Sequence, residues 1–157
     1  MMMQTHIDPN AFGYVVADVA RLFRAEIDRR IAEAGLGLTP GEGRALSHVA
    51  RAGLARQTSI AERMGVEAMT MSGYLDRLEG AQLIERLPDP SDRRAKLVRV
   101  TANADAVLVA IHRISTALRG ELARSVTQTE WEATNASLRR LRDGLSKMRE
   151  TRESHAA

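Results

Sequence analysis

A short cationic segment, Arg93, Arg94 and Lys96 with the anionic Asp92 beside it, carries the most distinctive chemistry in the chain. Proline, aspartate and serine fill residues 88–91, so we expect the segment at the tip of a β-hairpin. Cations at such a tip can contact DNA phosphates or enter a narrow minor groove, where negative potential is concentrated. Asp92 is no phosphate ligand, and we expect it to orient the guanidinium of a neighbouring arginine before DNA arrives. The alternative is a solvated turn with an incidental Asp–Arg pair.

A second group of polar side chains lies on a helix predicted over residues 68–81. Met71, Leu75 and Leu78 recur at helical spacing and should face a core. The opposite face then carries Thr70, Gly73, Tyr74 and Arg77. Threonine and tyrosine can hydrogen-bond bases or phosphates, and an arginine can bind a phosphate or a guanine through two hydrogen bonds. The alternative is that these are ordinary solvated helix positions.

The elements around these residues predict a helix-turn-helix followed by a β-hairpin wing. A helix over residues 58–64 ends at Gly65, a candidate left-handed cap, and the helix over 68–81 follows closely. Before them, Thr39 to Glu42 form a capping box that opens a helix ending at Gly53. After them, residues 83–87 and 97–100 are predicted strands. We therefore expect a winged helix-turn-helix lobe over residues 39–101.

The two ends of the chain are predicted to form dimerisation helices, over residues 12–34 and 103–150. Both segments carry apolar residues at steps of three and four. The last helix has a nearly heptad seam, Leu138, Leu141, Leu145 and Met148. Residues from about Thr151 are expected to be frayed. The predicted fold is mainly α with a small β-hairpin wing, in a single domain over residues 1–157 that forms a homodimer.

The segment from Asp92 to Thr101, with the sequence DRRAKLVRVT, resembles the wing signature of the MarR (multiple antibiotic resistance regulator) family. Residues 75–79 and 83–86 are similar to the end of that family's recognition helix and to its first wing strand. The order of elements resembles the family over roughly residues 12–150. The resemblance implies a dimeric regulator that grips a palindrome with two winged lobes and is often released by a small ligand. It also implies that Asp92 and Arg94 form the wing pair, and that Ser72, Tyr74 and Arg77 lie on the DNA-facing helix.

Two residues depart from the pattern of that family. Gly73 stands where many members have an arginine that reads bases, so the operator sequence is not predictable from the family. Gln82 stands where a glycine usually ends the recognition helix, so the turn into the wing is expected to be built differently.

The composition argues against several other classes of function. The chain has no cysteine, which excludes disulfides, thiolate zinc sites and a thiol-based oxidant sensor. The histidines, His6, His48, His112 and His155, show no metal-ligand spacing, and we expect neither metal nor cofactor. His48 and His112 could line a ligand crevice, or could simply be packed or solvated. No nucleophile elbow, phosphate-cradling loop or carboxylate pair is present, so we do not expect an enzyme.

The prediction from sequence is a cytoplasmic, sequence-specific transcriptional regulator, more often a repressor. Its expected partners are double-stranded DNA, a second copy of the chain and a small-molecule effector, with no membrane and no signal peptide. The net charge of +3 is weak evidence by itself, although all but two of the 23 cationic residues are arginines. The alternative is a helical interaction or scaffold protein that keeps a winged fold without using DNA. The cationic hairpin tip favours the DNA-binding regulator over the scaffold protein, because a protein-binding surface would not need it.

Overall fold

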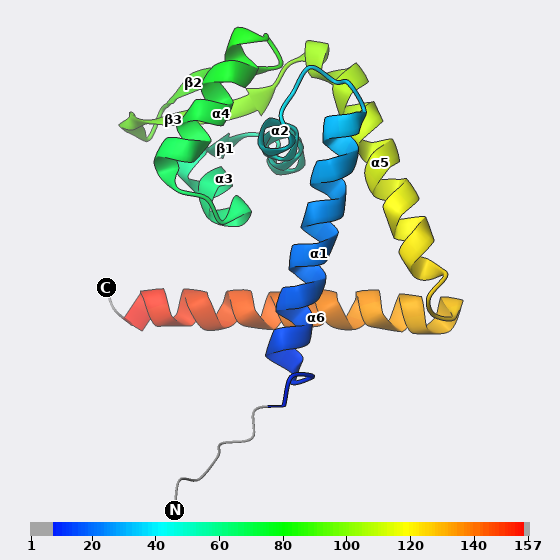
Figure 1. Ribbon diagram of the computed structural model, residues 1–157. Coiled ribbons are helices and arrows are strands. Elements are labelled where there is room, and N and C mark those ends of the chain that lie inside the picture. The colour runs from blue at the N-terminus through cyan, green and yellow to red at the C-terminus, as the bar shows by residue number, and fades with distance from the viewer. Residues whose placement is uncertain (1–7, 156–157) are drawn as a thin grey trace, which may run out of the picture. The chain divides into compact units, whose positions relative to one another are not determined.

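The computed structural model describes residues 8–155, in two compact units that meet between Ser115 and Thr116. Each unit is described by itself below, with the element labels of Figure 1. The elements are α1 (Phe12–Glu33), α2 (Pro40–Ala52), β1 (Ala55–Arg56), α3 (Gln57–Met64), α4 (Ala68–Gly80), β2 (Ile84–Asp89), β3 (Asp92–Val100), a 3₁₀ turn (Ala102–Ala104), α5 (Asp105–Ala123) and α6 (Gln128–His155).

The core of the winged lobe lies where α2, α3 and α4 meet the sheet. The three residues predicted to face inward from α4, Met71, Leu75 and Leu78, are fully buried. They join a cluster that also contains Leu46, Val49, Ile60, Ile84 and Val98. Burying aliphatic side chains of this size stabilises the lobe by roughly 1.5–3 kcal/mol each. The helix-turn-helix and wing predicted from sequence are therefore confirmed as elements of one packed lobe.

The ends of these helices follow the predicted capping chemistry. The hydroxyl of Thr39 accepts a hydrogen bond from the N–H of Glu42 at 3.3 Å, and the Glu42 carboxylate accepts one from the N–H of Thr39 at 3.0 Å. Pro40 occupies the first helical position of α2, where its missing N–H costs nothing. Gly65 ends α3 with φ of 66°. Both predictions, the capping box and the left-handed cap, are confirmed.

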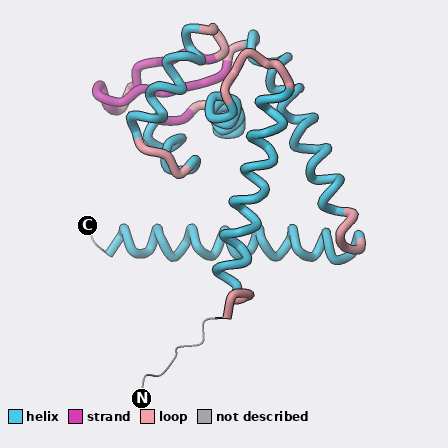
Figure 2. The backbone as a smooth tube through the Cα atoms, viewed as in Figure 1, coloured by secondary structure: helices cyan, strands magenta, loops and turns pink. Residues whose placement is uncertain are grey.

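The sheet is larger than the sequence predicted. It has three antiparallel strands in the order β1–β3–β2, with Ala55 paired to Val98 and Ile84 paired to Val100. Strand β2 ends at Asp89 and strand β3 begins at Asp92, so the turn between them is much shorter than the predicted one. Pro88 is tolerated within β2 because an edge strand does not need every N–H for pairing. Figure 2 shows the hairpin of β2 and β3 extending beyond the helices of the lobe.

The turn between α4 and β2 keeps a left-handed backbone without a glycine. Gln82 has φ of 59°, and it is the single non-glycine residue with positive φ among residues 8–155. Its carbonyl accepts hydrogen bonds from the Thr101 hydroxyl at 2.6 Å and from the Asn103 amide at 3.3 Å. These bonds fix the turn against the end of the wing, and they offset the strain of a side chain in this conformation.

Helix α1 packs through its second half only. Ile27 and Ile31 are buried, and Asp28 pairs with Arg44 of α2 at 2.9 Å. Its first half leaves an apolar stripe exposed, which contains Phe12, Val15, Val16, Val19 and Leu22.

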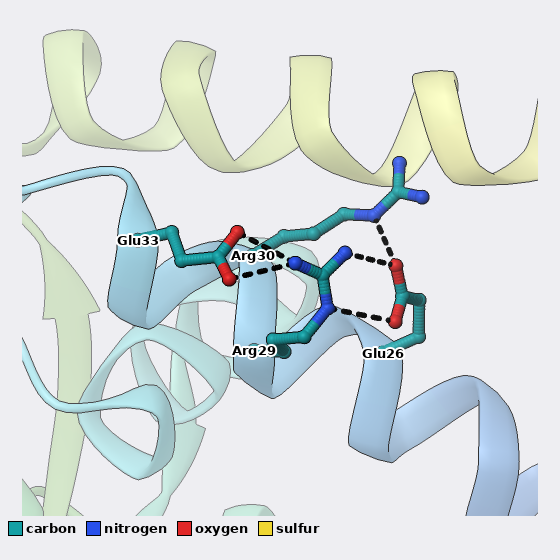
Figure 3. Close-up of polar contacts among 4 residues, drawn as sticks. All are labelled: Glu26, Arg29, Arg30 and Glu33. Carbon is teal, nitrogen blue, oxygen red and sulfur yellow. Dashed lines mark hydrogen bonds and ion pairs between the residues drawn. The ribbon is translucent and has the colours of Figure 1, made fainter.

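Another face of α1 carries a ladder of ion pairs, shown in Figure 3. Arg29 binds both Glu26 and Glu33, and Arg30 also binds Glu26. The bonds from Arg29 and Arg30 lower the pKa of Glu26 to about 2. Ion pairs three or four residues apart support the helix that carries them, so the ladder serves α1 itself.

The second unit contains the long helix α6. A capping box between Thr127 and Glu130 opens it, with the Thr127 N–H bonded to the Glu130 carboxylate at 2.8 Å. The helix continues to His155, so the predicted fraying from about Thr151 is wrong. The predicted seam is strongly exposed, at 48%, 47%, 67% and 63% for Leu138, Leu141, Leu145 and Met148. None of the helices within residues 8–155 is long and apolar enough to cross a membrane.

Candidate nucleic-acid interface

The outward face of α4 differs in part from the predicted one. Thr70 and Arg77 are exposed, but Ser72 and Tyr74 are half-buried. Among the large apolar side chains of residues 8–155, Met69 of α4 is the most exposed, at 86%, and the sequence analysis did not single it out. Its signal was available, because it lies opposite the buried residue Met71 and one turn before Gly73.

Tyr74 packs against α2 and does not point freely outward. A Cβ added at Gly41 would lie 2.5 Å from the tyrosine ring, so only a glycine leaves room for the ring there. The expectation that Tyr74 belongs to the freely solvated face is therefore corrected. Close packing at Gly41 draws the ring toward the first turn of α2.

Arg77 is tied to the same turn of α2. Its Nε donates to the carboxylate of Glu42, and its guanidinium lies 5.9 Å from the centroid of the Tyr74 ring. Burial alone would raise the pKa of Glu42. The hydrogen bonds from the Thr39 N–H and the Arg77 guanidinium outweigh this effect, so the net pKa is lowered and the carboxylate is ionised. The Arg77 side chain is still 60% exposed. It can therefore contact a phosphate while Glu42 fixes its direction.

A second arginine clamps α4 to the wing. Arg86 of β2 donates to Asp76 and to Glu79, both at 2.7 Å, and its side chain is only 15% exposed. The same guanidinium reaches the Ser72 carbonyl at 3.4 Å. The wing and the C-terminal part of α4 are thus held together by charged hydrogen bonds, which are stronger than neutral ones.

The wing contains an arginine held by a carboxylate, but not the predicted pair. Asp92 accepts a hydrogen bond from the backbone N–H of Arg94 at 3.0 Å, and it does not bind the guanidinium. The prediction that Asp92 orients the Arg94 side chain is therefore wrong for this state of the protein. The reason is local, because an aspartate at the start of a strand bonds most readily to the N–H two residues later.

Near the hairpin turn, the carboxylate that holds a guanidinium is Asp89, while Glu85 binds Arg99 further along the two wing strands. Asp89 is 6% exposed, and it accepts from Nε of Arg56 at 2.6 Å. It also accepts from the N–H and the hydroxyl of Ser91, at 2.8 and 2.7 Å. The bonds from Ser91, and then the one from Arg56, lower the pKa of Asp89 to about 2. This anchor joins the hairpin turn to β1 and was not predicted.

Two of the wing cations, Arg94 and Lys96, line a small cavity beside the start of α3. The cavity has a volume of about 220 Å³ and is lined by Arg56, Gln57, Thr58, Arg94, Ala95 and Lys96. Among residues 8–155, no acidic group pairs with Arg93, Arg94 or Lys96. Three unpaired cations and an anchored arginine therefore lie along one strand and its neighbour. This arrangement suits a polyanion that passes along the wing.

A second cavity lies among α1, α2 and the first half of α5. Its volume is about 330 Å³, and its walls combine Phe23, Ile27, Ile31 and Ile111 with Arg24, Arg44 and His48. Burial, followed by the charges of Arg51 and Arg44, lowers the pKa of His48, which keeps the imidazole neutral at pH 7. His112 lines an adjoining cavity of about 300 Å³. His6 lies outside the described residues, and residues 8–155 contain no cluster of groups that could hold a metal ion.

Comparisons with known proteins agree with this geometry. Residues 38–96 match the model of the MarR family. The crystal structure of the transcriptional regulator PA3341 is 32% identical, with a TM-score of 0.72 over 87% of this chain and 98% of that chain. A crystal structure of MarR is 26% identical, with a TM-score of 0.76 over 92% of this chain and 98% of that one. A mutant of MarR from E. coli complexed with operator DNA shares the fold, at 21% identity and a TM-score of 0.65 over 84% and 94% of the two chains.

Proposed function

This chain belongs to the MarR family of transcriptional regulators, and we propose that it is a homodimeric repressor of the cytoplasm that a small molecule releases from a palindromic operator. The proposal has three parts, which are DNA binding, dimerisation and ligand response. Each part rests on a different region of the molecule.

The observation that carries the DNA-binding part is the set of unpaired cations on the anchored wing. Arg93, Arg94 and Lys96 have no acidic partner within residues 8–155, and the anchor between Asp89 and Arg56 holds their strand in place. In a helix-turn-helix, the second helix enters the major groove, which assigns this role to α4. We infer that Thr70, Ser72, Tyr74 and Arg77 line that contact, while the wing with Asp92, Arg93, Arg94 and Lys96 reaches the neighbouring backbone and minor groove. The E. coli MarR mutant that shares this fold is complexed with operator DNA, which supports DNA binding by a protein of this fold.

The exposed apolar faces support dimerisation. The first half of α1 and the seam on α6 together leave most of their large apolar side chains in solvent. Large exposed apolar surfaces, such as each of these two helices carries, mark association sites in soluble proteins. A second copy of the chain is the partner that would also supply the second winged lobe for a palindrome.

The mixed lining of the cavity among α1, α2 and α5 supports a ligand with an apolar body and an anionic end. Phe23, Ile27 and Ile111 suit the body, and Arg24 suits a carboxylate, whereas Arg44 is already paired with Asp28. Helix α2, which lines this cavity through His48, also holds Arg77 through Glu42. A ligand that shifts α2 would therefore move a residue of the proposed DNA-contacting helix.

Selection from a random duplex library, followed by a salt titration, tests the DNA-binding part. We expect an inverted repeat with half-site centres about 10 base pairs apart or a near multiple of that spacing. We also expect log affinity to fall linearly with log salt, by about 0.9 per phosphate contacted. Failure to enrich any sequence would favour the scaffold alternative.

The ligand part is tested with benzoate, a small aromatic carboxylate, as the probe. We expect benzoate to raise the melting temperature and to weaken binding to the selected duplex. Arg24→Gln should reduce both effects while leaving binding without benzoate nearly unchanged. Equal responses of the two proteins would contradict this assignment of the cavity.

A further inference from the structure

The recognition helix α4 has few side chains that could read bases by hydrogen bonds. The side chains that bind a guanine or an adenine through two hydrogen bonds are arginine, lysine, asparagine and glutamine. Of these, α4 contains Arg77 alone, and Glu42 already holds its Nε. Asp76 is bound to Arg86, and the Tyr74 ring lies over Gly41. Most polar side chains of the helix are therefore already bonded to, or packed against, other residues of the protein, although Asp76 and Arg77 remain exposed.

The face of α4 that remains is small and apolar at its centre. Met69 is 86% exposed, the largest exposed fraction among the large apolar side chains of residues 8–155. Gly73 lies one turn further on, and a Cβ added there would meet no atom within 4 Å. Thr70, which is also exposed, adds a methyl group beside Met69. The glycine removes bulk from the outward face, which would let the backbone come close to a ligand at this point.

We propose that α4 recognises the C5-methyl groups of thymines in the major groove, through Met69 and the methyl group of Thr70. The proposal rests on the proposed operator binding and specifies which feature of the operator is read. Thymine is the one base that displays a methyl group in that groove, and apolar side chains contact it. The cations of the wing and Arg77 supply affinity for the DNA phosphates. The apolar face of α4 can then supply the preference for thymine over other bases.

The experiment uses the consensus duplex obtained by selection with the wild-type protein. Each thymine in a half-site is replaced in turn by deoxyuridine, which removes only the methyl group. Affinity is measured by fluorescence anisotropy at one salt concentration. We expect a loss of about fourfold at each contacted thymine, which is the effect of burying one methyl group.

Two further duplexes and two variants separate a methyl contact from a hydrogen bond. At a contacted position, a pair containing 5-methylcytosine should bind about fourfold more tightly than the pair containing cytosine. Met69→Ala should bind the thymine and uracil duplexes with nearly equal affinity at thymines that Met69 contacts, while thymines contacted by Thr70 keep the difference. Met69→Leu, which keeps an apolar side chain, should retain most of the difference. Thermal melting confirms that both variants are folded, as the exposure of Met69 leads us to expect.

Each possible result decides the proposal. A consensus without thymine in the half-site, or one in which uracil has no effect, overturns methyl reading and leaves the repressor proposal standing. Dissociation of the dimer by Met69→Ala would assign the side chain to a contact between copies and also overturn it. If selection enriches no sequence, the proposed function itself fails and this inference fails with it.

Discussion

Asp89, near the tip of the wing, accepts a 2.6 Å hydrogen bond from Nε of Arg56, a residue 33 positions earlier that ends β1. The same carboxylate holds the N–H and the hydroxyl of Ser91. One buried carboxylate therefore closes the hairpin turn and also joins it to the start of α3. Because Arg56 lines the same cavity as Arg94 and Lys96, this anchor places the wing cations relative to the helix-turn-helix.

Asp89→Asn should make the stability of the protein less dependent on pH in acid. The pKa of Asp89 is lowered from 3.8 to about 2 by Ser91 and Arg56, so its bonds stabilise the fold fully above about pH 4. That contribution is lost as the pH falls from about 4 toward 2. An asparagine side chain does not titrate in this range, so the variant has no such pH-dependent contribution to lose. Urea unfolding between pH 5 and pH 2.5 measures the effect. Parallel curves for the wild type and Asp89→Asn would show that ionisation of Asp89 does not stabilise the fold.

Gly41→Ala should destabilise the lobe by about 1–3 kcal/mol, because the new methyl group would lie 2.5 Å from the Tyr74 ring. Tyr74→Leu, which removes the obstructing end of the ring, should recover most of that loss in the double variant. Urea unfolding of the two single variants and the double variant gives the coupling energy. Simple additivity of the two losses would mean that Tyr74 does not pack on Gly41.

Gln82→Gly should stabilise the protein by roughly 0.5–1 kcal/mol. Relief of the left-handed strain at φ of 59° outweighs the greater chain entropy of glycine in the unfolded state. The bonds from Thr101 and Asn103 go to the Gln82 carbonyl and survive the change. Gln82→Ala is the matched control, because it shortens the side chain but keeps the strained Cβ. The same gain in both variants would rule out backbone strain as the cause.

Leu141→Asp combined with Leu145→Asp should give monomers or insoluble protein. Both leucines lie on the exposed seam of α6, and a charge buried in a dimer interface without a partner is costly. The control pair, Arg139→Ser with Ser146→Asp, changes the net charge by the same amount on the opposite face of α6. Light scattering should report an unchanged dimer for the control and a loss of the dimer for the test pair. A soluble dimer in both cases would show that the seam of α6 is not part of the dimer interface.

The lobe was predictable because its signals are local. The spacing of Met71, Leu75 and Leu78, the capping box at Thr39 and the cap at Gly65 each depend on residues within one or two turns. Helix positions and the inward face of α4 follow from such patterns directly. The strand β1, only two residues long, carries no pattern of its own and exists because β3 offers it an edge.

The details of the candidate interface were less predictable, because they depend on contacts between distant residues. Asp92 and Asp89 are both acidic residues near the turn, and only the folded hairpin shows which one meets an arginine. Tyr74 and Arg77 have outward positions on a helical wheel, yet Tyr74 packs on Gly41 of α2 and Arg77, although exposed, is bonded to Glu42. Met69 could have been found from the helical period alone, since its position is opposite the buried stripe.

The revised role of Asp92 gives a control for the wing. Asp92→Asn removes an anion from a surface that would face DNA, while an amide oxygen still accepts the N–H of Arg94. We therefore expect Asp92→Asn to bind the selected duplex at least as tightly as the wild type. Weaker binding would restore an orienting role for the Asp92 charge.

The central claim is that the wing contacts operator DNA, and Arg94→Ala tests it most directly. Fluorescence anisotropy is measured with the wild type and the variant on the same selected duplex over a series of salt concentrations. If Arg94 binds in the groove or to a phosphate, the variant should bind more weakly by about 1–3 kcal/mol, and its salt slope should be smaller by about one. An Arg94→Ala protein with the affinity and salt slope of the wild type would contradict the claim.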